Sequence, residues 1–413
     1  MSLSRRNDEL WIEGCNARAL ADGHGTPLYV YSRAAIESAW RAYDQAFAAH
    51  PHLICYAVKA NGSLAILQLL ARLGSGFDIV SGGELARVMK AGGDPARVVF
   101  SGVGKRDEEI EQALEAGILA FNVESEPELE RIARIASARG QRARISLRVN
   151  PDVDARTHPY ISTGMKENKF GIDIHAAEAL YHRAADMPGI EVTGLDFHIG
   201  SQLTELDPLA DALSRSLALV DRLEAAGITL EHLDIGGGLG IRYRDEAPPT
   251  PAALAERLGP LLEGRPQTLL MEPGRALVGE AGVLLTRVEY LKSGHREFAV
   301  VDAAMNDLMR PALYQAWQRI ETVAPEAVPA RAYDIVGPVC ETADTLGAER
   351  SLALRPGSVL AIHGAGAYGF AMASQYNARP RPAEILVDGD TAHVIRQRES
   401  FEDLWRGETL LER

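Results

Sequence analysis

The sequence predicts an α/β fold with a closed (β/α)8 barrel of the TIM type, followed by a C-terminal all-β domain built as a sandwich or barrel. Between about residues 50 and 275, eight short apolar runs alternate with segments of helical apolar spacing, a pattern typical of βαβ units in a parallel sheet. Eight strands close such a barrel. After residue 278, strand-like runs follow one another with turn signals between them, which indicates a separate β domain.

Each expected barrel strand is a short apolar run. Segments such as SLAILQLLARLG and EPELERIARIASARG, with apolar residues three and four apart, supply the intervening helices. An open, doubly wound sheet is the alternative arrangement of the same units. The expected strands are 53–58, 76–80, 97–100, 118–122, 143–149, 191–197, 230–235 and 267–271.

The β domain is expected from the runs VLLTRVEYLK, EFAVVD, RAYDIVG, SVLAIH, AEILVDG and TAHVIRQ. The N-terminal run LYVYS fits either domain by its sequence, and we assign it to the β domain. The expected boundaries are therefore residues 35–278 for the barrel, and residues 1–34 together with 279–413 for the β domain.

The segment from Asn150 to Gly171 interrupts the alternation of strands and helices. It is rich in Pro, Gly and Asn, too polar for the core, and long for a βα loop. Because loops on the carboxyl-terminal face of a barrel often carry function, we expect this segment to close over a site there.

Composition and charge exclude several classes of function. The net charge of −14 argues against binding of nucleic acid or of an anionic membrane. Cys15, Cys55 and Cys340 lack metal-ligand spacing, so we expect a reducing cytoplasm and no metal site. No signal-peptide pattern and no apolar run of about 18 residues is visible, so no membrane partner is expected.

Polar residues follow the expected barrel strands at their carboxyl ends, where barrel enzymes place catalytic residues. Lys59 ends the first strand, where desolvation would lower the pKa of its amine and favour an imine. A strand-end lysine that reaches solvent is the alternative. His198 ends the sixth strand and could stack on a flat cofactor, or be an ordinary part-buried histidine.

The last two strand ends suit a phosphorylated heteroaromatic ligand. Gly236, Gly237 and Gly238 let the backbone approach a phosphate, although three glycines can also form a simple tight turn. Glu272 could hold a heteroaromatic nitrogen protonated, and Arg275 suits a carboxylate or phosphate, unless the two are a surface ion pair. An amine, a stacking ring, a phosphate site and an acid together describe a pyridoxal phosphate site.

The same residues carry a resemblance to a known family. The motifs YAVKAN, VSGGEL, STGMKENKFGI, HIGSQ, GGGLGI, EPGRALV, MRPALY, GPVCET and GAYGF stand in the order found in the diaminopimelate decarboxylases, over residues 27–396. That family is similar to alanine racemase in its barrel and belongs to the fold-type III decarboxylases. The resemblance implies pyridoxal 5′-phosphate as cofactor, a homodimer with shared active sites, and decarboxylation of meso-2,6-diaminopimelate to L-lysine, the last step of lysine biosynthesis.

The resemblance also implies roles for individual residues. Lys59 would form the Schiff base, His198 would stack on the cofactor ring, Glu272 would contact its pyridine nitrogen, and Cys340 would donate a proton across the dimer interface. From its position at the end of the second strand, Asp78 could pair with Lys59 or cap the next helix. The phosphate would be surrounded by Ser201, Gly236, Gly237, Gly238, Gly274 and Arg275, and the substrate by Arg275, Arg310, Tyr314, Glu341 and Tyr368, the last also near the cofactor.

The chemistry of this substrate fits these assignments. Arg310 and Tyr314 can bind its distal carboxylate, and Glu341 can accept a hydrogen bond from its distal ammonium. The i, i+4 spacing places Arg310 and Tyr314 on one side of the segment if it is helical. The stretches 342–345 and 363–364 depart from the family pattern without removing a named residue, so they affect only the expected shape of the distal pocket.

Three other functions stay open. A related decarboxylase acting on ornithine, arginine or carboxynorspermidine would have less need of Arg310 and Tyr314, since its substrate lacks the distal carboxylate. A racemase on the same barrel would need a second acid–base residue, and none is evident. A non-catalytic homologue that binds pyridoxal phosphate should have lost Lys59 or Cys340.

Overall fold

The structure, a computed structural model, describes residues 3–153 and 169–412 and divides into two compact units. Residues 154–168, most of the segment expected to close over a site, lie outside the described residues. Within the described residues, no helix combines the length and the apolar character needed to cross a membrane. The barrel unit comprises Glu37–Ile241 and Ala247–Leu277, and the β unit comprises Met1–Ile36, Arg242–Glu246 and Val278–Arg413.

The barrel unit confirms the predicted TIM barrel. Eight parallel strands pair in the order β5-β6-β7-β8-β9-β11-β12-β13, and β13 pairs with β5, so the sheet closes on itself. All eight expected strands are present, with small shifts at their ends. They are β5 (His52–Ala57), β6 (Gly76–Ile79), β7 (Val98–Phe100), β8 (Ala120–Val123), β9 (Ala143–Asn150), β11 (Ile190–Asp196), β12 (His232–Asp234) and β13 (Thr268–Met271).

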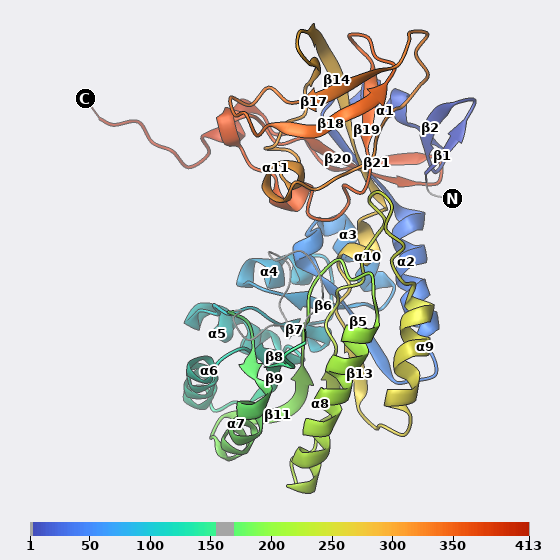
Figure 1. The fold of residues 1–413 in the computed structure, drawn as a ribbon. Coiled ribbons are helices and arrows are strands. Elements are labelled where there is room, and N and C mark those ends of the chain that lie inside the picture. Colours follow the sequence, from blue (N-terminus) through green and yellow to red (C-terminus); the bar gives the residue numbers. More distant parts are fainter. Residues whose placement is uncertain (1–2, 154–168, 413) are drawn as a thin grey trace. The chain divides into compact units, whose positions relative to one another are not determined.

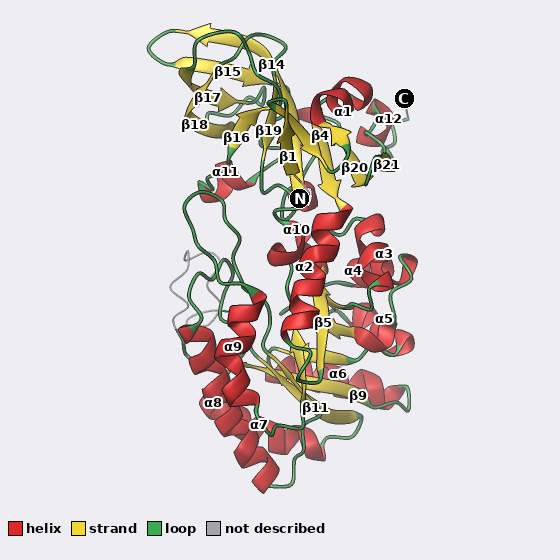
Figure 2. Cartoon of the chain, turned by 90° about the vertical axis from the view of Figure 1, so that its right-hand side faces the viewer, coloured by secondary structure: helices red, strands yellow, loops and turns green. Residues whose placement is uncertain are grey.

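Helices surround the parallel strands (Figures 1 and 2) because each has one apolar side. In α6, for example, Leu129, Ile132 and Ala136 are buried at spacings of three and four, and Ser125 caps the helix through the N–H of Glu128. The short strand β10 (Ile172–Asp173) adds to β9. The helices are α2 (Arg33–Ala46), α3 (Leu64–Arg72), α4 (Gly82–Lys90), α5 (Asp107–Ala116), α6 (Glu126–Ala138), α7 (Ile174–Asp186), α8 (Asp207–Ala225), α9 (Pro251–Leu262) and α10 (Arg275–Val278).

The β unit confirms the predicted second domain of mostly sheet structure. Its central strand β14 (Gly282–Ser293) pairs antiparallel with β4 (Leu28–Ser32), β15 and β19. The run LYVYS is therefore part of this unit as β4, where all five residues are buried between β14 and β20 (Ala383–Asp388). The remaining strands of this sheet are β15 (Glu297–Val301), β16 (Ile320–Thr322), β17 (Arg331–Val336), β18 (Thr345–Leu352), β19 (Val359–Ile362) and β21 (Thr391–Arg396).

Several elements of the β unit differ from the all-β expectation. Helix α1 (Ala17–His24) forms because Asn16 accepts a hydrogen bond from the N–H of Ala19, and because Ala17, Leu20 and Ala21 pack into the apolar core. The sequence patterns did not predict β16, β18 or the small N-terminal sheet. The N-terminal sheet consists of β1 (Leu3–Arg6), β2 (Glu9–Ile12) and β3 (Cys15–Asn16). Helix α12 (Phe401–Leu404) was also not expected, whereas α11 (Arg310–Tyr314) is the helix that the spacing of Arg310 and Tyr314 allowed.

Candidate active site

Lys59 lies in a 3-10 turn (Val58–Ala60) directly after β5, where the sequence predicts the end of the strand. Its Nζ donates a hydrogen bond of 2.5 Å to Oδ2 of Asp78, on the neighbouring strand β6. Asp78 is fully buried; burial and then Glu272 raise the pKa of its carboxyl group, while Lys59 opposes this shift. Asp78 therefore pairs with Lys59, and Ser81 caps the following helix instead.

Glu272 and His198 follow β13 and β11 and form an ion pair. Nε2 of His198 lies 2.9 Å from Oε2 of Glu272, and Nδ1 lies 3.5 Å from Oδ1 of Asp196. Burial alone would lower the pKa of His198, but Glu272 and Asp196 outweigh it and raise this pKa to about 9. Burial would likewise raise the pKa of Glu272, but His198 lowers it on balance. Both side chains are therefore charged at neutral pH.

Three buried carboxyl groups, those of Asp196, Asp234 and Glu272, gather at this end of the barrel with oxygen atoms within 4.8 Å of one another. Burial, and then the charges of Glu272 and Asp196, raise the pKa of Asp234 well above its ordinary value, which favours the neutral acid. Arg148 lies 3.9 Å from Asp196 and 2.9 Å from Glu124. The cluster thus combines carboxyl groups with a fixed cation beneath the site.

Sequence reasoning missed Asp196, Asp234 and Arg148. Each lies inside or at the end of an apolar strand run, in GLDF, HLDI and SLRVN. A charged residue in such a run must be paired when the strand is buried, and this is the signal that could have found them. Carboxylate oxygens are also ligands for hard cations, but here Arg148 and His198 already supply the positive charge.

The glycine loop, Gly236 to Gly238, follows β12 and packs against the same side chains. A Cβ atom at Gly236 would lie 2.6 Å from the imidazole of His198, and one at Gly237 would lie 2.2 Å from the carbonyl oxygen of Glu272. Gly236 and Gly238 also have φ angles of 65° and 114°. Only glycine fits here, so the loop offers bare backbone, the surface that a phosphate needs.

A hydroxyl and a guanidinium group lie at the same end of the barrel. Nη2 of Arg275, at the start of α10, donates a hydrogen bond of 3.1 Å to Oγ of Ser201. Gly274 packs closely on the turn that carries Lys59, since a Cβ atom there would lie 3.0 Å from that of Ala60. Ser201, Gly274 and Arg275, which are predicted to bind the phosphate, therefore lie at the same end of the barrel as Lys59.

The chemistry of these groups fits pyridoxal phosphate. The barrel unit brings together an amine (Lys59), an ionised buried carboxylate (Glu272), an imidazole (His198) and donors for an anion. Oδ1 of Asp78 and Oδ2 of Asp234 are buried with no hydrogen-bond partner among the described residues. Unpaired buried oxygens of this kind are typical of a site that a polar ligand completes.

The remaining predicted site residues lie in the β unit. Arg310 and Tyr314 begin and end the helix α11, so the spacing of four falls within one helical turn. The guanidinium of Arg310 is buried and lies over the ring of Tyr243, 4.5 Å from its centroid. Tyr368 has a φ of 56°, in the left-handed region that few side chains adopt.

Cys340 and Glu341 lie in an exposed turn that other polar groups fix. The N–H of Cys340 donates to Oδ1 of Asn377 at 3.0 Å, and the carboxylate of Glu341 accepts from the hydroxyl of Tyr376. The turn therefore has a defined shape although both side chains face solvent.

Asp344 lies in the first stretch that departs from the family pattern, and it holds this turn in place. Its buried carboxylate accepts hydrogen bonds from the N–H groups of Met305 at 2.6 Å and Val339 at 2.8 Å. In the second stretch, Nε2 of His363 lies 2.8 Å from Oε1 of Glu321. Both departures thus contribute contacts of their own.

Comparison with known proteins gives matches over the whole chain. Residues 33–279 match the family of the pyridoxal-dependent decarboxylases, pyridoxal binding domain. The diaminopimelate decarboxylase of Pseudomonas aeruginosa is 59% identical over 411 residues, which cover 99% of each chain. Two solved structures are diaminopimelate decarboxylases complexed with L-lysine. The structure from Helicobacter pylori is 46% identical and has a TM-score of 0.92, and the match covers 95% of this chain and 98% of that chain. The structure from M. jannaschii is 38% identical and has a TM-score of 0.95, and the match covers 99% of this chain and 98% of that chain.

Proposed function

Since the chain belongs to the family of the diaminopimelate decarboxylases, we propose that it converts meso-2,6-diaminopimelate into L-lysine and carbon dioxide, the last step of lysine biosynthesis. The observation that carries this proposal is the group of residues at the carboxyl end of the barrel: the Lys59 amine, the Glu272–His198 pair and the glycine loop. Because the reaction is biosynthetic, we place the enzyme in the cytoplasm.

Each part of the cofactor has a partner in the barrel unit. Pyridoxal 5′-phosphate supplies an electron sink for the electron pair that the departing carboxyl group leaves behind. Lys59 would bind its aldehyde carbon, His198 would stack on its ring, and Glu272 would hold a proton on its pyridine nitrogen. Glu272 suits this role because its lowered pKa keeps the carboxylate ionised. The phosphate would be held by Ser201, Gly236, Gly237, Gly238, Gly274 and Arg275.

Asp78 would control the proton on Lys59. A lysine amine must be neutral to attack a carbonyl carbon, whereas an ammonium group cannot. The carboxyl group of Asp78 lies 2.5 Å from Nζ, and burial raises its pKa. Asp78 can therefore accept the proton of Nζ at short range and also orient the amine toward the cofactor.

The β unit would bind the part of the substrate that does not react. The substrate has two amino-acid ends, and we propose that the D-configured end loses its carboxyl group. Arg310 would bind the distal carboxylate together with the hydroxyl of Tyr314, and Glu341 would accept a hydrogen bond from the distal ammonium. Arg275 and Tyr368 would complete the substrate site, with Tyr368 also near the cofactor.

Cys340 would protonate the carbon from which carbon dioxide has left. Its exposure lets solvent return the proton to the thiol after each turnover. The family resemblance supports a homodimer in which Cys340 serves the site of the second copy. A Cys340→Ala enzyme with full activity, or a fully active monomer in sedimentation, would contradict this assignment.

The test of the function is release of carbon dioxide from meso-diaminopimelate with added pyridoxal 5′-phosphate. We expect release by the natural enzyme and by Lys90→Ala, which removes an exposed lysine on α4, and none by Lys59→Ala. Absorbance of the bound cofactor should show the bond to lysine in the first two proteins only.

Ornithine and carboxynorspermidine serve as competing substrates in the same assay. Release of carbon dioxide from one of these compounds but not from meso-diaminopimelate would support the assigned cofactor site and refute the assigned binding site for the distal end of the substrate. Cofactor binding without release from any substrate would instead favour a non-catalytic binding protein.

A further inference from the structure

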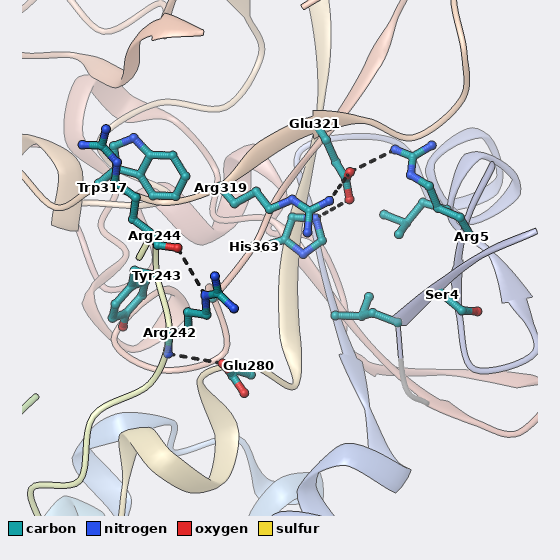
Figure 3. A pocket seen from close by; sticks show the side chains of 13 residues that line it. Ser4, Arg5, Arg242, Tyr243, Arg244, Glu280, Trp317, Arg319, Glu321 and His363 are labelled. Atoms are coloured by element: carbon teal, nitrogen blue, oxygen red, sulfur yellow. Dashed lines mark hydrogen bonds and ion pairs between the residues drawn. The ribbon is translucent and has the colours of Figure 1, made fainter. Parts of the chain in front are cut away.

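The β unit contains a cavity of about 560 Å³, a volume typical of small-molecule sites. Its walls come from parts of the chain that are far apart in sequence: the N-terminal strands, residues 242–244, and the segments 317–321 and 363–364. Figure 3 shows their side chains converging on one space. None of the residues assigned above to cofactor or substrate lines it.

Positive side chains dominate this cavity. The chain as a whole carries a net charge of −14, so a local excess of cations is not a general property of the protein. Such a local field attracts and retains anions in an otherwise acidic molecule. The charged lining residues are Arg5, Arg242, Arg244, Arg319 and His363, against Glu280 and Glu321.

One wall of the cavity is a fixed group of cations around Glu321. Its carboxylate accepts from Nη2 of Arg319 at 2.7 Å and Nη2 of Arg5 at 3.1 Å, and lies 2.8 Å from Nε2 of His363. Burial would raise the pKa of Glu321, but His363 and the arginines lower it to about 2. One carboxylate cannot satisfy all donors of two guanidinium groups, so donors of Arg5 and Arg319 remain for a second anion.

The opposite wall holds Arg242 and Arg244, and Nε of Arg244 lies 3.2 Å from Oδ2 of Asp245 in an ion pair. Nε of Arg242 donates to the carbonyl oxygen of Arg244 at 3.3 Å, and among the described residues its guanidinium makes no ion pair. Arg244 lies over the indole of Trp317, 5.7 Å from its centroid, and Arg350 lies 4.2 Å from the same ring. The two guanidinium groups and the indole fix the geometry of this wall.

We propose that this cavity binds a small organic dianion, a phosphate monoester or a dicarboxylate, between Arg242 on one wall and Arg319 on the other. Arginine suits such ligands because its planar guanidinium donates two parallel hydrogen bonds to a phosphate or carboxylate.

This site is distinct from the proposed active site in its chemistry. The proposed substrate carries two ammonium groups as well as two carboxylates, and the product L-lysine carries a net positive charge. Either ammonium group would face four arginines and two carboxylates here, and Glu321 is already paired with Arg5 and Arg319. A dianion without ammonium groups matches the cavity, so the inference does not depend on the proposed reaction.

The test is calorimetric titration of the enzyme loaded with pyridoxal 5′-phosphate, in saturating L-lysine. The cofactor and the L-lysine fill the active site, so its phosphate and carboxylate partners are not available to the probe. The probes are glycerol 2-phosphate, a phosphate monoester, and succinate, a dicarboxylate, with glycerol as the neutral comparator. We expect one dianion per chain, weaker binding at high salt, and no binding of glycerol.

Three variants decide the assignment. Arg242→Ala and Arg319→Ala should each weaken dianion binding about tenfold or more, whereas Arg331→Ala, at an exposed arginine of β17, should leave it unchanged. Glu321→Gln should strengthen binding, because it removes the carboxylate that competes with the ligand for Arg5 and Arg319. Absence of binding by every probe, or unchanged affinity in a folded Arg242→Ala enzyme with normal cofactor absorbance, would overturn the proposal.

Discussion

Replacement of Glu272 by glutamine should lower the pKa of His198 from about 9 to its ordinary value near 6.5 or below. Burial alone would depress this pKa, and the carboxylate of Glu272, 2.9 Å from Nε2, is the largest influence that raises it. The glutamine side chain would keep the shape of the glutamate and remove its charge. A change from about 9 to 6.5 corresponds to roughly 3 kcal/mol of interaction with the imidazolium form.

The same interaction makes the stability of the fold depend on pH. The pKa of His198 is higher in the folded protein than in the unfolded chain, so its stabilising contribution is complete below about pH 6.5 and is lost as the pH rises through 9. In cofactor-free protein, the free energy of unfolding in urea should therefore fall more steeply over this range in the natural enzyme than in Glu272→Gln. Glu84 and Asp307, with pKa values raised to about 7, titrate in both proteins and cancel in the comparison.

The direct assay is an NMR titration of the histidine rings in cofactor-free protein. His232 provides an internal control, since burial lowers its pKa to about 4 and its nearest partner is Ser146 rather than Glu272. Its titration should not change in the variant. If the pKa of His198 in a folded Glu272→Gln protein stays within about half a unit of the natural value, the assignment of this ion pair is refuted.

Three further substitutions test other parts of the site. Cys340→Ala should lower kcat about a hundredfold or more, as expected for loss of a general acid. Unchanged turnover in the carbon dioxide assay would exclude the role. Gly237→Ala should abolish cofactor binding in equilibrium dialysis, because its Cβ would lie 2.2 Å from the carbonyl oxygen of Glu272. A variant that binds the cofactor as tightly as the natural enzyme would contradict the tight packing of the loop. Asp344→Ala should lower the free energy of unfolding, measured in urea, by about 2–4 kcal/mol, because two charge-assisted hydrogen bonds are lost. It should also lower kcat while the absorbance of the bound cofactor stays normal. An effect on stability alone would show that the Cys340 turn does not need Asp344 to hold it in place.

The barrel was predictable because its strands are buried on both sides. Such strands appear in sequence as short continuous apolar runs, and the helices between them show a regular spacing of three and four. The strand-end residues Lys59, Glu272 and the glycine loop could be located on the same basis, since parallel strands bring their carboxyl ends to one face.

Other parts of the β unit left weaker signals. Strand β18 contains Gly347 and a left-handed Glu349, and its pairing with β17 shifts register, so no regular alternation of apolar residues survives. Strand β1 is partly exposed and rich in charge, which resembles a loop in sequence. Edge strands of this kind depend on pairing partners that local patterns do not contain.

The cluster of buried charged residues at the site and the cationic cavity were also not predictable from the sequence, but the reason is a different one. Asp196, Asp234 and Arg148 come from different strands, and their mutual distances follow from the closure of the barrel. Arg5, Arg242 and Arg319 likewise meet only after folding. Each residue alone has an ordinary interpretation, and only their convergence in space carries chemical meaning.

The position of β4 has a consequence for the order in which the protein is synthesised. This buried strand lies near the N-terminus, yet one of its two neighbours, β20, is among the last elements to leave the ribosome. The barrel strands are complete much earlier, at β13, and can close while β4 still lacks this partner. During that interval an apolar strand edge, LYVYS, stays exposed to other chains, as unpaired edges are in aggregation. Strand β20 therefore protects the nascent protein as well as completing the sheet.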